Sequence, residues 1–335
     1  MSTAAIKPSP KPDLAAMRAL VGDDLARVNA AILEQAQSDI PLISQLASHL
    51  IAAGGKRLRP CLTIAAAKLC GYSGERHVRL AASVEFIHTA TLLHDDVVDD
   101  SHLRRGEATA NALWGNKSSV LVGDFLLSRA FQLMVADGSL DVLKVLSDAA
   151  GIISAGEVHQ LTVSHDLAIT QEVYEQVISA KTAALFAAAC EIGAIVSGRP
   201  EWREALRGYG QALGMAFQLA DDALDYMADE AALGKAIGDD FRDGKVTMPV
   251  LLAYAQGSAE ERAFWEAALA GGEALAEAQL AKAKQLLKQH RTCEATIARA
   301  EVFVAEAIRL LAPFPDSPAR RAMIEAAEFA CQRAY

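Results

Sequence analysis

Four aspartates stand within LLHDDVVDDSHLRRG, residues 92–106, directly after an apolar run. Residues four positions apart share one face of a helix, so Asp95 and Asp99 point the same way, with Asp96 and Asp100 alongside. Like charges at this spacing destabilise an isolated helix unless a hard cation lies between them. Mg²⁺ is such a cation, and it combines one or two carboxylates with substrate phosphates. Taken alone, the stretch fits either a magnesium site or a solvated acidic helix end.

A second aspartate set follows another apolar run, in FQLADDALDY at residues 217–226. Asp221, Asp222 and Asp225 repeat the spacing i, i+1, i+4 of the first set. Two such segments far apart in the chain could face each other across a helical bundle, where facing helices do hold carboxylate metal sites. The pair predicts a centre for several divalent ions and disfavours the solvated helix end.

Basic residues accompany both aspartate sets. They are Arg104 and Arg105 after the first set, Lys235 and Lys245 after the second, and Lys56, Arg57 and Arg59 in the loop GGKRLRP. Arginine matches phosphate oxygens with two parallel N–H donors, and lysine supplies a point charge. Carboxylates that hold magnesium opposite such cations indicate one or two diphosphate-binding sites.

The elements that position these residues are predicted to be helices. The chain has 335 residues, of which 52% are hydrophobic, with 6% aromatics and abundant alanine and leucine. Alanine and leucine lose little on entering a helix, and no stretch alternates as a strand does. Residues 1–12 are predicted to be a flexible tail and 13–335 one large all-α domain, with a charged, glycine-rich surface loop at 228–245. Apolar periodicity predicts the later helices at 75–100, 120–134, 140–164, 171–197, 201–227, 247–256, 258–270, 273–290, 294–312 and 318–334.

Composition limits the partners and the compartment. A net charge of −10 disfavours nucleic acid as a partner. The five cysteines are odd in number and lack CxxC spacing, so we interpret them as reduced thiols. The N-terminus lacks the apolar core of a signal peptide, and no apolar run reaches the length of about 18 residues typical of a membrane span. We therefore expect a cytoplasmic protein with no integral membrane segment.

The segments GGKRLRP, LLHDDVVDDSHLRRG and FQLADDALDY, in this order, resemble the trans-isoprenyl diphosphate synthases. The resemblance extends from about residue 40 to the C-terminus, and EFIHTATLLHDDVVD is most similar to bacterial octaprenyl and decaprenyl diphosphate synthases, which make quinone side chains. It implies a helical bundle of the isoprenoid synthase type with a central active-site cavity. It also implies two to three Mg²⁺ ions per site and a homodimer.

The resemblance further implies roles for individual residues. The site for isopentenyl diphosphate would comprise Lys56, Arg59, His88 and Arg105. The allylic diphosphate would be held by Arg104, Lys181, Thr182, Gln218 and Lys235, with Lys245 nearby. Magnesium would bind Asp95, Asp99, Asp221 and Asp225, supported by Asp96 and Asp222. The implied catalytic set is Asp95, Asp96, Asp99, Arg104, Lys181, Asp221 and Lys235.

The implied reaction is a 1′-4 condensation of isopentenyl diphosphate onto an allylic diphosphate, with farnesyl diphosphate as the expected primer. Metal ions and cationic side chains neutralise the leaving diphosphate, while apolar walls exclude the water that would quench an allylic cation. Thr91 lies one turn before Asp95, with Ala90 beside it, and these small side chains leave room for a long product. Phe131 and Met134 are candidates for the floor of that channel.

Four other interpretations stay open at this point. A short- or medium-chain synthase, such as a geranylgeranyl synthase, keeps the chemistry but closes the channel earlier. An HD-type phosphohydrolase would use His94 with Asp95, yet it leaves the second aspartate set without a role. A terpene cyclase shares the fold but usually carries Asn, Ser and Glu ligands in its second metal site. A non-catalytic partner subunit typically lacks the aspartates that this chain retains.

Overall fold

A computed structural model describes residues 14–52, 55, 57–104, 106–227, 238–270 and 277–332. These ranges are almost entirely helical, so the predicted all-α class is confirmed. The longer helices are α1 (Ala15–Gln35), α2 (Pro41–Ala52), α3 (Leu58–Leu69), α4 (Arg76–Val98), α6 (Asn116–Asp137), α7 (Leu140–Val163), α8 (Gln171–Ile178), α9 (Ala184–Val196), α10 (Arg203–Met227), α13 (Met248–Gln256), α14 (Ala259–Leu269), α15 (Glu277–Gln289), α16 (Thr292–Leu310) and α17 (Pro318–Gln332). The shorter elements are α5 (Ala110–Trp114), α12 (Asp239–Arg242), the 3₁₀ turn η2 (Pro200–Trp202) and the antiparallel hairpin of β1 (Leu103–Arg104) with β2 (Glu107–Ala108).

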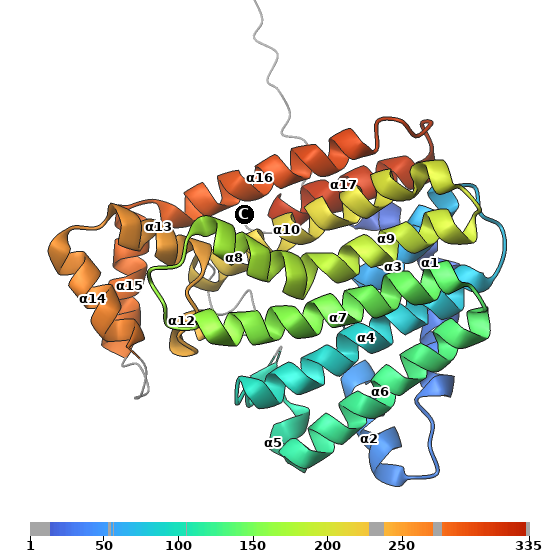
Figure 1. Ribbon diagram of the computed structural model, residues 1–335, viewed down its shortest axis with the longest axis horizontal. Helices are drawn as coiled ribbons and strands as arrows, with labels where there is room; N and C mark the ends of the chain where they lie inside the picture. The colour runs from blue at the N-terminus through green and yellow to red at the C-terminus, as the bar shows by residue number, and fades with distance from the viewer. Residues whose placement is uncertain are drawn as a thin grey trace, which may run out of the picture.

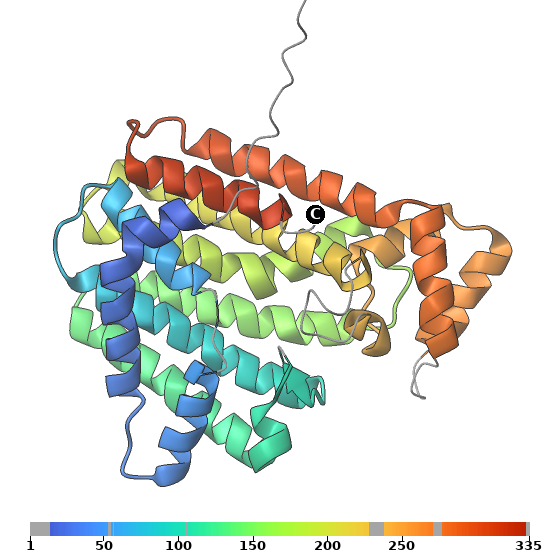
Figure 2. The ribbon, with the colours of Figure 1, turned by 180° about the vertical axis from the view of Figure 1, so that it is seen from behind.

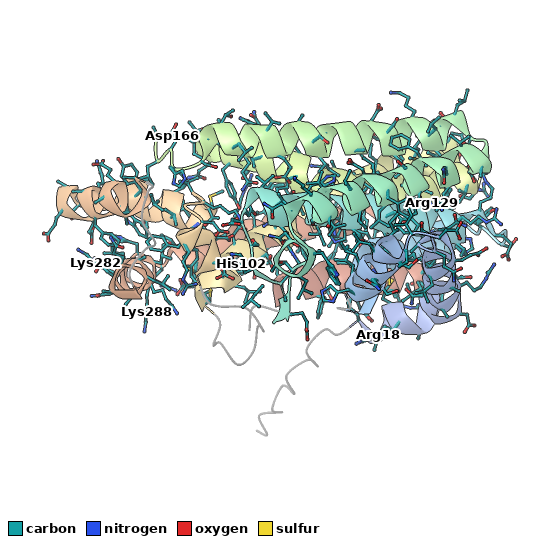
Figure 3. All side chains as sticks on the ribbon, turned by 90° about the horizontal axis from the view of Figure 1, so that it is seen from below. Arg18, His102, Arg129, Asp166, Lys282 and Lys288 are labelled. Atoms are coloured by element: carbon teal, nitrogen blue, oxygen red, sulfur yellow. The ribbon has the colours of Figure 1, made fainter. Side chains whose placement is uncertain are left out.

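The helices that carry the aspartates run lengthwise through a bundle. α4, α6, α7, α9 and α10 extend along the molecule, and α10 packs most extensively against α16 and α9 (Figure 1). From behind, α1 crosses one end of the bundle beside α3, and α16 and α17 cover a neighbouring side (Figure 2). α14 and α15 project beyond the opposite end, where Lys282 and Lys288 of α15 lie (Figure 3). Both aspartate sets therefore belong to long helices held by packing on several sides.

Two glycines allow α10 to lie unusually close to the first turn of α9 and to the residue just before it. A Cβ atom at Gly214 would stand 2.5 Å from the Cα of Ala183, and one at Gly210 would stand 2.3 Å from the carbonyl oxygen of Phe186. Real Cβ atoms do not approach backbone atoms so closely, so any larger side chain would push the helices apart. The contact brings the last turns of α10, with the second aspartate set, against the middle of the 171–197 segment.

The apolar periodicity predicts one regular helix over residues 171–197, but the structure divides this segment. A π-helical turn, η1 (Ser179–Ala183), separates α8 from α9 and carries Lys181 and Thr182. π turns are rare and occur mostly as single turns within α-helices, frequently at functional sites. The pattern of apolar residues could not predict this turn, because both flanking helices keep a normal period.

The first aspartate helix also ends earlier than the predicted 75–100. α4 stops before Asp99, which caps it, and Asp100 adopts a left-handed backbone with φ of +48°. The side-chain amide of Asn111 donates to the carbonyl oxygen of Asp96 at 3.1 Å and so satisfies one of the helix-end acceptors. The prediction that Asp100 lies alongside the other aspartates on a helical face is therefore wrong.

The predicted surface loop at 228–245 contains the short helix α12 at its far end. Residues 228–237 lie outside the described residues, and so do the predicted tail at 1–12 and the site candidates Lys56, Arg105 and Lys235. All five cysteines are buried and free, in agreement with their interpretation as reduced thiols.

Two stretches, Asn116–Asp137 and Gln171–Val196, are long and apolar enough to cross a membrane. In the second, 78% of the apolar window is buried inside the fold, which is what a core helix requires. Only 39% is buried in the first, where Leu121 and Val135 of α6 are exposed to 67% and 65%. Helix α6 therefore presents an apolar outer face.

Candidate active site

One pocket gathers polar side chains from the end of α7, from η1, from α10 and from the segment after α12. With its open mouth it encloses about 680 Å³. Its polar lining includes Gln160, Lys181, Thr182, Gln218, Asp222, Asp240 and Lys245, and its apolar lining includes Val163, Ile169, Val177, Ile178 and Val246. Residues far apart in the sequence, among them five of the predicted site residues or their supports, thus meet at one place.

Asp95 of the first aspartate set faces a lysine from η1. The Nζ of Lys181 lies 3.9 Å from Asp95 Oδ2 and donates to Glu157 Oε2 of α7 at 2.7 Å. Burial raises the pKa of Asp95 to about 7; Lys181 opposes this rise, while the negative charges of Glu157 and Asp99 add to it. Asp95 is thus a half-buried carboxylate beside two further carboxylates, opposed by Lys181 and Arg104, which is a setting that can hold a bound cation.

Two other members of the first set, Asp96 and Asp99, form ion pairs. Arg104, on the hairpin, donates from Nε and from a terminal nitrogen to Asp96 Oδ1, at 2.9 and 2.7 Å. Lys245 Nζ lies 2.9 Å from Asp99 Oδ2 and 3.0 Å from Asp243 Oδ2. Asp96 is almost fully buried, at 2% exposure, so its pair with Arg104 fixes the hairpin against the end of α4.

Two aspartates of the second set have different hydrogen-bond partners. Asp222 is buried and accepts hydrogen bonds from the Tyr174 hydroxyl and, at 2.7 Å, from Gln218 Nε2. Asp225 accepts from the backbone amide of Asp240 at 3.2 Å and so holds the start of α12. Burial raises the pKa of Asp222, and the charge of Asp240 adds to the rise against the two donated hydrogen bonds.

Arg59 and His88, both predicted to bind isopentenyl diphosphate, lie side by side. A terminal nitrogen of Arg59 is 3.1 Å from His88 Nε2, and the guanidinium stacks 4.4 Å from the centre of the Phe186 ring. The aromatic face holds the guanidinium in place without neutralising its charge. The structure therefore brings these two predicted residues together, although they come from different helices.

The residues predicted to set chain length separate into buried and exposed positions. Ala90 is 1% exposed, Thr91 is half-buried with its hydroxyl donating to the His88 carbonyl oxygen, and Met134 is fully buried. Phe131 is 37% exposed on α6. Of the two candidates for the floor, Met134 lies inside the bundle and Phe131 on its outer face.

His94 does not share a site with Asp95. Its Nε2 lies 3.3 Å from the Val120 carbonyl oxygen and 3.5 Å from Asp124 Oδ1, both on α6. An HD-type metal site needs the histidine and the aspartate on one ion, so this geometry removes the structural basis for that interpretation.

The donor set fits magnesium that is shared with a substrate. Among the described residues, no group of three or more His, Cys, Asp or Glu side chains stands close enough to hold a metal alone. Mg²⁺ seldom uses such a cage; it takes one or two carboxylates and completes its shell with phosphate oxygens and water. Half-buried Asp95, its near neighbour Asp99 and the cations around them satisfy that requirement.

Two residues of this site were missed in the sequence. Glu157 binds Lys181, and Tyr174 binds Asp222, yet each is a single polar residue within an ordinary amphipathic helix. No spacing signal distinguishes such a residue from one on a solvated face, because its partner lies on another helix.

Fold and pocket together define an all-α enzyme that places carboxylates and cations around one apolar-walled cavity. Residues 40–287 match the polyprenyl synthetase family. The chain is 49% identical to octaprenyl diphosphate synthase of Escherichia coli (strain K12), over 94% of this chain and 97% of that protein. A polyprenyl synthase from Caulobacter crescentus CB15, crystallised with calcium and isoprenyl diphosphate, is 50% identical with a TM-score of 0.94 over 98% of this chain and 100% of that one. A decaprenyl diphosphate synthase from Rhodobacter capsulatus is 49% identical with a TM-score of 0.91, over 96% and 100% of the two chains.

The chain belongs to the polyprenyl synthetase family. It is a prenyltransferase, and its reaction is the condensation of isopentenyl diphosphate onto an allylic diphosphate. The resemblance drawn from the three sequence motifs is confirmed, and the phosphohydrolase and terpene cyclase interpretations fall with it.

Proposed function

We propose that this enzyme makes a long all-trans polyprenyl diphosphate, in the octaprenyl to decaprenyl range, from farnesyl diphosphate and isopentenyl diphosphate. The observation that carries this proposal is the 49% identity to an octaprenyl diphosphate synthase over nearly the whole length of both chains. A product of this length suits the side chain of a quinone.

The cations divide between the two substrates. Lys181 and Lys245, which line the pocket, and Arg104 beside them hold the allylic diphosphate, with Lys235 as a further ligand. Arg59 and His88 hold isopentenyl diphosphate, together with Lys56 and Arg105. The support for this division is that Arg59 pairs with His88 and stacks on Phe186, whereas Lys181 and Lys245 face aspartates of the first set.

Magnesium, two to three ions per site, would be held by Asp95 and Asp99 of α4 and by Asp221 and Asp225 of α10, and would neutralise the charge that develops on the leaving diphosphate. Lys181 and Lys245 stabilise the same charge from the pocket wall. Val177, Ile178 and Val246 exclude water from the allylic carbon, so that the double bond of isopentenyl diphosphate reacts with it instead. The proton released in that step passes to the departing diphosphate.

The product grows away from this pocket, past the small side chains of Ala90 and Thr91. Met134, buried on the neighbouring helix α6, closes the channel. A medium-chain product remains the second candidate, because the last part of the channel depends on side chains whose effect on length has to be measured.

Purified protein with farnesyl diphosphate, isopentenyl diphosphate and Mg²⁺ tests the proposal, with the dephosphorylated products sized by mass spectrometry. We expect a ladder of intermediates that ends at octaprenyl to decaprenyl. An end point at geranylgeranyl would keep the reaction and overturn the long channel, and no condensation would favour a non-catalytic partner subunit.

We also propose that the enzyme is a cytoplasmic homodimer, with residues 13–335 of each chain as one prenyltransferase domain. The apolar outer face of α6 supports a contact between two copies, since Leu121, Phe131 and Val135 are all exposed there. Sedimentation equilibrium measures the assembly state directly. Leu121→Glu with Val135→Glu should yield monomers, whereas a wild-type monomer would overturn the dimer.

A further inference from the structure

Four side chains form a hydrogen-bonded chain along one wall of the pocket. The Tyr174 hydroxyl donates to Asp222 Oδ2, and Gln218 Nε2 donates to Asp222 Oδ1 at 2.7 Å. Thr182 Oγ1 donates to Gln218 Oε1 at 2.7 Å. All four residues line the pocket, and they come from three elements: α8, η1 and α10.

The chemistry of these groups fixes the direction of every hydrogen bond. The amide nitrogen of Gln218 can only donate, so Asp222 Oδ1 accepts from it, and the Tyr174 hydroxyl donates to Asp222 Oδ2. The amide oxygen of Gln218 then points to Thr182, which must donate because an amide oxygen only accepts. The proton of Thr182 is thereby directed at Gln218, and its lone pairs stay available to the pocket.

Tyr174 stands at the closed end of this chain. It is 4% exposed and Asp222 is 2% exposed, so the phenol hydroxyl can meet the carboxylate but not bulk water. A phenylalanine would fill nearly the same volume, and the apolar packing of α8 does not need the hydroxyl. The hydroxyl serves Asp222, whose other oxygen is the anchor of the Gln218 amide.

We propose that Tyr174 is a positioning residue of the condensation reaction. Its hydroxyl holds Asp222, Asp222 holds the Gln218 amide in one orientation, and the amide directs the lone pairs of Thr182 toward the pocket where positive charge develops on the allylic carbon. Without that hydroxyl, Asp222 can turn, the amide can rotate, and the pocket wall loses a fixed electron-rich group. The inference rests on the proposed role of this pocket in holding the allylic substrate.

Tyr174→Phe tests the proposal, with Tyr209→Phe as the matched control. Tyr209 is also buried and donates one hydrogen bond, to the Met323 carbonyl oxygen at 2.7 Å, at the other end of α10. We expect Tyr174→Phe to lower kcat by about 10- to 100-fold, the size of effect that a small misplacement causes, with KM for both substrates nearly unchanged. Tyr209→Phe should lower Tm by a similar amount and leave kcat at the wild-type value.

A double-mutant cycle separates positioning from packing. In a Gln218→Ala background the chain is already broken, so adding Tyr174→Phe should lower Tm further without lowering kcat further. Equal kcat losses in the two tyrosine variants, or a kcat loss that is fully additive with Gln218→Ala, would overturn the proposal. If Tyr174→Phe does not fold, Tyr174→Met, which also lacks the hydroxyl, replaces it in the cycle with the same expectation. An inactive wild-type enzyme would instead overturn the proposed function.

Discussion

The ammonium group of Lys245 lies 2.9 Å from the carboxylate of Asp99, a residue 146 positions earlier in the chain. This pair connects the segment after α12 to the end of α4, and therefore the second half of the site to the first. Burial lowers the pKa of Lys245, but the carboxylates of Asp240, Asp99 and Asp243 outweigh it and raise the pKa above its usual value. The lysine therefore stays charged at neutral pH and at moderately alkaline pH.

Lys245→Met should lower kcat/KM by about 100-fold, because it removes a half-buried cation that we propose faces the diphosphate. Since Lys245 stays protonated, the ratio of mutant to wild-type rate should not change between pH 6 and 9. Steady-state kinetics of both proteins between pH 6 and 9 measures this ratio. Lys144→Met, at an exposed lysine of α7 that pairs with Asp148, is the control and should act as wild type. A ratio that approaches one at high pH would contradict the permanent charge.

Asp95→Asn should remove most of the activity, by about 1,000-fold in kcat, because the amide cannot balance a metal ion. The concentration of Mg²⁺ needed for half-maximal rate should also rise. Asp148→Asn is the matched control, since that aspartate is exposed on α7 and pairs only with a flexible lysine. An Asp95→Asn enzyme with an unchanged magnesium requirement would exclude Asp95 as a ligand.

Gly214→Ala should destabilise the fold and disturb the site together. The added methyl group would stand 2.5 Å from the Cα of Ala183, so α10 must move away from η1. We expect a loss of about 1–3 kcal/mol in the free energy of unfolding, the usual cost of overpacking, with a lower kcat because Gln218 moves away from Thr182. Gly151→Ala is the control, as nothing lies within 4 Å of its Cβ position. Denaturant titration of both variants measures the free energy of unfolding, and steady-state kinetics measures kcat.

The folded protein should lose stability as the pH rises above about 9. Burial raises the pKa of Cys61 and of Cys293 to about 12, and that of Cys70 to about 11. Thiols of the unfolded chain ionise near pH 8.5, so above that pH the unfolded state binds fewer protons than the folded state and is favoured. The stability that these thiols provide is complete below pH 8.5 and is lost as the pH rises toward 11 to 12. Unfolding by guanidinium at pH 8, 9 and 10 measures the slope, and Cys61→Ala should reduce it.

Thr91→Phe should shorten the product, because an aromatic ring would block the channel one turn from Asp95. Met134→Ala should lengthen it, since it removes the buried side chain that we propose closes the channel. Phe131→Ala, on the exposed face of the same helix, is the comparison. If that face does not contribute to the channel, this variant should leave the product length unchanged. Product sizing by mass spectrometry distinguishes these outcomes. A longer product from Phe131→Ala would move the floor to the surface of α6.

The charged residues of the candidate site could be predicted because they occur in short sequence motifs with a characteristic spacing. Two DDxxD segments and their neighbouring cations indicated the class of enzyme, and the structure pairs Lys181 with Asp95 and Lys245 with Asp99. The helical class followed from composition, since alanine and leucine favour helices wherever they pack.

What the sequence could not supply depends on tertiary contacts. At the end of α4 the Asp96 carbonyl oxygen accepts from the backbone amide of Ser101 and from the side-chain amide of Asn111 on another helix, and Asp100 leaves the helix, so the helical face assigned to Asp100 was wrong. Glu157 and Tyr174 acquire roles only through partners more than twenty residues away. Side chains that act through a neighbour leave no local pattern, and only the folded chain can identify them.

Because of the π-helical turn, the wall of this pocket depends on the number of residues between α8 and α9 as well as on their type. Helices α8 and α9 share one axis, but a turn with an additional residue puts their buried faces out of phase by about 100°. Deleting one residue between positions 179 and 183 would restore a regular helix and rotate α8, with its tyrosine, away from α10. The helical register of this segment is therefore part of what positions Tyr174, Lys181 and Thr182, and a change in the number of residues between 179 and 183 should displace all three.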